Sequence, residues 1–146
     1  MRVDFYQLSR GPVEAALPLI ARRTLQQGER MLVVSADAQQ CQRISRAMWA
    51  YGGGEAFLAN GIAGEGDEER QPILLSSDMV PMNGARYLAI ADGRWREGDT
   101  AFERVFFLFD DETVQHARET WRGLRGREGA ERHYWKQEDG RWVQAG

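Results

Sequence analysis

The chain has the length and composition of one globular domain: 146 residues and 16.6 kDa, with 42% hydrophobic and 28% charged residues. Its formal charge of -3 at pH 7 and pI near 5.5 argue against a protein that grips phosphate backbones through its overall charge. The one cysteine, Cys41, excludes an internal disulfide and any multi-cysteine zinc site, and it suits a reducing compartment.

Targeting and repeat signals are missing from the sequence. No apolar run approaches the length of a membrane helix, and residues 1–8 are too few and too mixed for a signal peptide. We therefore expect a cytoplasmic protein. No linker, internal repeat or low-complexity segment divides the chain, so we expect a single domain over residues 1–146.

The N-terminal residues predict a strand followed by a helix. Residues 3–8 are rich in β-forming side chains and run into a Ser-Arg-Gly-Pro break. Apolar residues then recur at helical spacing from Val13, and Gly28 is a stop signal. Because Pro18 removes a backbone donor, we expect the regular part of this helix to start later or to kink.

A second strand and helix follow with short connections. The apolar run 31–34 predicts a strand that is covered on both faces. Asp37 is an N-cap residue with Gln40 three positions on, as in a capping box. The predicted helix carries Cys41 on its apolar face and extends to Trp49.

The rest of the chain predicts more strands and a last helix. Further strands are expected at residues 73–75, 87–90 and 105–109. Residues 61–70 are polar, glycine-rich and acidic, which predicts a flexible surface loop. Asp110 or Asp111 caps a helix through about Arg125, and residues 126–146 form an aromatic and basic C-terminal tail.

Strands and helices that alternate with short connections predict the α/β class. We expect a single Rossmann-like domain, with a mainly parallel central sheet flanked by about three helices.

The sequence contains few of the motifs that an enzyme active site needs. Neither strand-to-helix turn is glycine-rich, and no G-x-x-x-x-G-K-[ST] run is present, so no nucleotide cofactor is predicted. A nucleophile would need a base, and the two histidines are His116 and His133. The consecutive acids 67–69 do not converge on one metal ion, and Cys41 is expected to be buried. We predict no catalytic residue, metal or cofactor.

The last predicted helix carries a distinctive face. Arg118, Trp121, Arg122 and Arg125 lie at i, i+3, i+4 and i+7, with Val114 one turn earlier on the same stripe. One interpretation is a socket for a peptide with a hydrophobic end and acidic groups. The other is that Trp121 packs in the core while the arginines complement the helix dipole. Residues 114–136 hold six cations and three anions, a local positive patch in an acidic protein.

Trp49 and Phe57 are a second pair of aromatic residues of interest, and they lie on either side of a glycine loop. Large aromatic residues at a helix end belong either to the core or to an interface, and the sequence leaves both interpretations open.

The order of these features resembles that of a known family, the chi subunit of bacterial DNA polymerase III holoenzyme, across about 140 residues. The matching elements, in chain order, are Phe5-Tyr6-x-Leu8, Gly28-x-Arg30-x-Leu32-Val33, Asp37-x-x-Gln40, Met48-Trp49, Phe57, Ala63-Gly64-Glu65-Gly66, Pro72-Ile73, Ala117-Arg118-x-x-Trp121-Arg122, Tyr134-Trp135-x-Gln137 and Gly140-Arg141-Trp142. No single element is specific, but their order and spacing are.

This resemblance implies a non-catalytic accessory subunit of the clamp-loader assembly, without a cofactor. Family members bind the acidic C-terminal tail of single-stranded-DNA-binding protein, which ends in a hydrophobic residue, and they pair with a psi subunit; DNA is reached indirectly. The family's tail pocket falls on Arg118, Trp121 and Arg122, with apolar help from the strand that ends at Phe109. Trp49 and Phe57 match exposed aromatic positions of the family and imply a second partner surface.

Two alternatives stay open at this point. One is a small α/β nucleotide-binding or helicase-like enzyme remnant, which the missing glycine-lysine loop disfavours. The other is direct binding of single-stranded nucleic acid by the C-terminal aromatic and arginine residues.

Overall fold

The structure is a computed structural model that describes residues 1–9, 11–51, 58–98, 101–138 and 141–145. Its strands are β1 (Arg2–Gln7), β2 (Met31–Val34), β3 (Asn60–Ile62), β4 (Ile73–Ser76), β5 (Tyr87–Ile90), β6 (Arg104–Phe109), β7 (Glu131–Glu138) and β8 (Arg141–Gln144). Its α-helices are α1 (Val13–Gln26), α2 (Ala38–Ala50) and α3 (Val114–Leu124), and the 3-10 helix η1 spans Glu68–Arg70.

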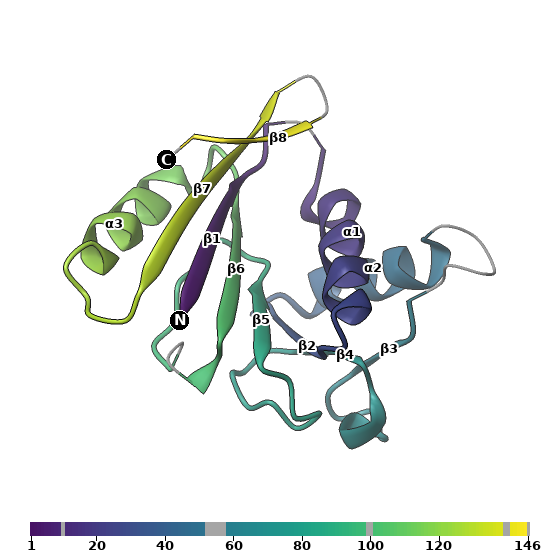
Figure 1. Ribbon diagram of the computed structural model, residues 1–146. Helices are drawn as coiled ribbons and strands as arrows, with labels where there is room; N and C mark the ends of the chain where they lie inside the picture. Colours follow the sequence, from purple (N-terminus) through teal and green to yellow (C-terminus); the bar gives the residue numbers. More distant parts are fainter. Residues whose placement is uncertain (10, 52–57, 99–100, 139–140, 146) are drawn as a thin grey trace.

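One sheet joins all the strands, in the order β3-β4-β2-β5-β6-β1-β7-β8. The pairings are parallel, except that β8 runs antiparallel to β7. Helices α1 and α2 lie on one face of the sheet and α3 lies on the other, beside β1 and β7 (Figure 1). The predicted α/β fold, with a mainly parallel sheet and three helices, is confirmed.

Strand β1 lies inside the sheet, between β6 and β7, and alternates between its two faces. Val3 and Phe5 join the apolar cluster under α3, whereas Tyr6 joins the cluster under α1 and α2. Asp4 is fully buried. Its carboxylate accepts hydrogen bonds from Arg104 Nε at 2.8 Å, Arg2 Nη2 at 3.1 Å and Trp135 Nε1 at 3.0 Å.

The first two helices begin close to their predicted positions. Helix α1 starts at Val13, so the later start expected from Pro18 is wrong; the proline is buried within the helix. Asp37 caps α2 as predicted, by accepting a hydrogen bond from the backbone N–H of Gln39 at 2.9 Å. Gln40 does not close a capping box, because its amide donates to the carbonyl oxygen of Ala91 at 3.0 Å.

Two segments differ from the sequence-based expectation. Residues 61–70, expected to be a loop, include the end of β3 and the helix η1. Residues 126–146, expected to be a tail, contribute β7 and β8 to the sheet, with Phe5 opposite Tyr134 in the parallel register of β1 and β7. The aromatic residues of β7 serve both sheet faces: Tyr134 packs on the α3 side and Trp135 on the α1 side.

Candidate functional site

The candidate site lies on helix α3. A turn at residues 110–113 determines where this helix begins. The Asp110 carboxylate accepts hydrogen bonds from the backbone N–H groups of Glu112 at 3.0 Å and Thr113 at 3.2 Å. These bonds keep residues 110–113 in a turn, so the helix begins at Val114 rather than directly after Asp110 or Asp111. Arg125 is the C-cap residue, close to the predicted end.

Trp121 is fixed at the edge of the core, where α3 meets β1 and β7. Its half-buried indole contacts the Phe5 ring edge to face at 5.1 Å and the Tyr134 ring at 5.6 Å between centroids. The Arg132 guanidinium lies 4.1 Å from the indole centroid and donates a hydrogen bond to the Trp121 carbonyl oxygen at 2.7 Å. These contacts leave the indole partly exposed but hold it in one orientation.

Three arginines lie on the same helix stripe as Trp121. Arg118, Arg122 and Arg125 are all exposed. Among the described residues, none of the three takes part in an ion pair, whereas Arg86, for instance, pairs with Glu29 and Glu103. Like charges one helical turn apart repel each other by a few tenths of a kcal/mol. A bound anion would relieve that repulsion. We call Val114, Arg118, Trp121, Arg122 and Arg125 the Arg–Trp face.

Tyr134 on β7 borders the Arg–Trp face. Burial raises the pKa of its phenol, and the nearby positive charge of Arg118 opposes that rise. The phenol donates a hydrogen bond to the Gln7 side chain. Lys136, two residues along the same strand face, places its ammonium 6.0 Å from the Tyr134 ring centroid. Strand β7 therefore adds Arg132 and Lys136 to the positive charge of α3.

Phe109 lies beneath the surface of this site. It ends β6, is 2% exposed, and its ring meets Tyr134 at 5.8 Å and Phe5 at 6.4 Å between centroids. It therefore supports the aromatic residues above it. Sequence reasoning missed Phe5 and Tyr134 as parts of the site, and it counted Arg132 only within the positive patch of residues 114–136. The alternation of aromatic and charged residues in 131–138 was a further signal for Arg132 and Tyr134.

The second predicted surface is separate from the first. Trp49, near the end of α2, is 49% exposed. It lies in the helix layer opposite α3, so the structure does not bring it to the Arg–Trp face (Figure 1). Phe57 is outside the described residues.

The carboxyl ends of β2 and β4 border a cavity of about 490 Å³, the usual place for a nucleotide in an α/β fold. Glu68 and Asp78 line it, and no arginine or lysine does so among the described residues. Such a lining would repel phosphate. Cys41 also borders this cavity; it is buried as predicted, and burial followed by the Asp37 charge raises its thiol pKa.

Metal-binding clusters and membrane-spanning helices are both absent from the described residues. These residues contain no group of three or more His, Cys, Asp or Glu side chains able to hold a metal ion. Within the same part of the chain, no helix combines the length and apolarity needed to cross a bilayer.

The chain matches a known protein family. A family model described as "DNA polymerase III chi subunit, HolC" matches residues 1–131, which include β1 to β6, all three helices and the Arg–Trp face. No curated protein matches the chain. Since the match covers most of the 146 residues, the chain belongs to the chi subunit family of DNA polymerase III, and so to the accessory subunits of DNA replication.

Proposed function

We propose that the Arg–Trp face binds the acidic C-terminal tail of single-stranded-DNA-binding protein. The chain would thereby act as a non-catalytic subunit that links the polymerase and its clamp loader to coated single-stranded DNA. The observation that carries the proposal is the set of three exposed guanidiniums, Arg118, Arg122 and Arg125. They have no ion-pair partner in the described part of the chain, and they share one helix stripe with the half-buried indole of Trp121.

Each part of such a tail has a matching group on this face. Guanidiniums bind carboxylates through two parallel hydrogen bonds, which suits both the acidic side chains and the terminal carboxylate. The terminal hydrophobic residue would pack against the exposed part of Trp121 and the half-buried Val114. The extra cations Arg132 and Lys136 on β7 would steer the acidic peptide toward the face.

The same proposal assigns a second surface to another subunit. Trp49 is one of the few large hydrophobic residues exposed in the described residues, and a solvent-facing aromatic ring is a frequent interface anchor. We assign it, with Phe57, to a psi-type or other clamp-loader subunit. Because α2 and α3 lie on opposite faces of the sheet, both partners can bind at once (Figure 1).

Calorimetric titration with the acidic tail peptide of the cognate single-stranded-DNA-binding protein tests the first surface. Arg118→Ala should weaken binding by about tenfold or more, as should removal of the terminal hydrophobic residue of the peptide. Arg46→Ala is the matched control, because it removes one exposed arginine on α2, in the opposite layer. Equal affinities of wild type and Arg118→Ala would refute the assignment of the site.

A further inference from the structure

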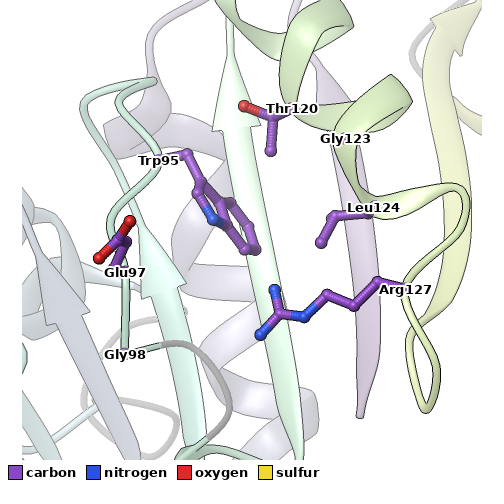
Figure 2. Close-up of a pocket in the computed structure, with 7 residues that line it drawn as sticks. All are labelled: Trp95, Glu97, Gly98, Thr120, Gly123, Leu124 and Arg127. Carbon is purple, nitrogen blue, oxygen red and sulfur yellow. The ribbon is translucent and has the colours of Figure 1, made fainter.

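A groove of about 470 Å³ lies beside α3, away from Tyr134 and β7. Its walls come from two segments: Trp95 and Glu97 follow β5, and Thr120, Gly123, Leu124 and Arg127 belong to α3 and the turn after it. Figure 2 shows the Trp95 indole extending into the space between the two segments, with the Arg127 side chain reaching toward it from the other wall. This volume is within the range of small-ligand sites, about 300–1,000 Å³.

The turn that carries Trp95 is held in place before any ligand binds. The Asp92 carboxylate accepts two hydrogen bonds from the Arg96 guanidinium, at 2.9 and 2.7 Å, and one from the backbone N–H of Arg94 at 3.2 Å. The backbone N–H of Trp95 donates to His116 Nε2 on α3 at 2.9 Å. A preorganised aromatic ring binds a ligand with little further loss of conformational entropy.

The environment of the Trp95 indole suits it to stack against a flat ligand. It is half-buried, with the Phe107 ring edge to face at 5.4 Å and the Phe5 ring nearly parallel at 6.5 Å. The opposite wall has no side chain at Gly123, and the space there is open, since an added Cβ would meet no atom within 4 Å. A flat ligand can therefore enter between α3 and the Trp95 turn without displacing a side chain at that position.

We propose that this groove binds single-stranded nucleic acid, with one base stacked on Trp95 and a neighbouring phosphate on Arg127. Aromatic platforms beside cations are the usual means by which proteins hold single strands without sequence readout.

Glu97 distinguishes a nucleotide from an acidic peptide as the ligand of this groove. Its carboxylate is exposed at the groove wall and would repel any anion beside it, the carboxylates of such a peptide and a phosphate alike, so the phosphate of a bound strand has to lie on the Arg127 side of the groove. It can instead accept a hydrogen bond from the exocyclic amino group of a base. Because Trp95, Glu97 and Arg127 are not members of the Arg–Trp face, this inference does not depend on the proposed peptide site.

Fluorescence anisotropy of a labelled 15-nucleotide oligo-dC at low salt, about 50 mM, tests the proposal. Wild type should bind, and binding should weaken steeply as salt increases. Trp95→Leu and Arg127→Ala should each reduce affinity by about fivefold or more. Arg46→Ala, which removes an exposed cation from the opposite layer, should bind as wild type does. A thermal melt of each variant identifies any loss that comes from unfolding.

The acidic tail peptide provides the second readout. Trp95→Leu should bind the peptide normally, whereas Arg118→Ala should lose the peptide and keep much of its affinity for the oligonucleotide. No oligonucleotide binding at low salt, or unchanged binding by both folded groove variants, would overturn the proposal. Loss of peptide binding in Trp95→Leu, without oligonucleotide binding by wild type, would assign the groove to the peptide instead.

Discussion

Asp4→Asn is a substitution whose effect on stability can be predicted from the contacts of the buried Asp4 side chain. The Asp4 side chain is 0% exposed and interacts with two guanidiniums, Arg104 at 2.8 Å and Arg2 at 3.1 Å. It also accepts the indole N–H of Trp135 at 3.0 Å, which connects β1 and β6 to β7. Asparagine keeps the shape of the side chain but removes the negative charge between the two cations.

The magnitude follows from the exposure of each partner. Removing one member of a buried ion pair costs about 3–5 kcal/mol. The Arg104 side chain is only 20% exposed, but that of Arg2 is 37% exposed, so solvent screens part of the second interaction. We therefore expect a loss of about 2–3 kcal/mol in the free energy of unfolding. For a chain of this length that lowers Tm by about 7–10 °C.

Differential scanning calorimetry near neutral pH measures the effect. Asp111→Asn is the matched control, since Asp111 is exposed and has no ion pair among the described residues, and its Tm should stay within about 1 °C of wild type. A decrease of less than about 2 °C for Asp4→Asn would show that the carboxylate does not hold β1, β6 and β7 together as described.

Three further predictions concern pH, backbone geometry and the cysteine. Burial, and next the Asp4 charge, raise the pKa of Tyr6 from 10.0 to about 12. The contribution of the neutral Tyr6 phenol to the free energy of unfolding should therefore be complete below pH 10 and decline by about 2–3 kcal/mol as pH rises toward 12. Urea unfolding should detect this loss in the wild type but not in Tyr6→Phe. Gly93 and Gly84 have φ of +71° and +73°, but only at Gly93 would a Cβ come within 2.5 Å of Thr113 Oγ1. Gly93→Ala should thus destabilise the protein by about 1 kcal/mol more than Gly84→Ala in urea unfolding, and equal effects would contradict this close approach of Gly93 to Thr113. Cys41 is 4% exposed and its pKa is raised, so a thiol reagent should modify it much more slowly in the native protein than in the unfolded protein, and equal labelling rates would contradict this burial.

The elements that the sequence predicted well are those with local signals. Strands β2 and β5 have their predicted bounds because each is a short apolar run between turn residues. The start of α3 was misplaced because the Asp110 carboxylate bonds within its own turn, an alternative to helix capping that the residue type does not distinguish. Strand β7 was missed because its pairing with β1 joins residues about 130 positions apart.

The residues of the candidate site also fall into two groups, those that local spacing predicts and those that only the fold brings together. The Arg–Trp face follows from helical spacing alone, so its five members could be found without the fold. Arg132 and Tyr134 join it only because β7 lies next to β1, beneath α3, and sequence spacing carries no information about that arrangement. Trp95 was missed for the same reason: it reaches α3 from a turn after β5, across the intervening strand β6.

Binding of the acidic tail of single-stranded-DNA-binding protein to the Arg–Trp face is the central claim, and an NMR titration tests it most directly. Backbone amide and tryptophan indole resonances of the isotope-labelled protein would be followed as the tail peptide is added. We expect the perturbed resonances to map to α3 and its C-cap residue Arg125, to the Trp121 indole and to residues 132–136 of β7. Perturbations centred on Trp49 or on the cavity at the ends of β2 and β4, or none at saturating peptide, would contradict the claim.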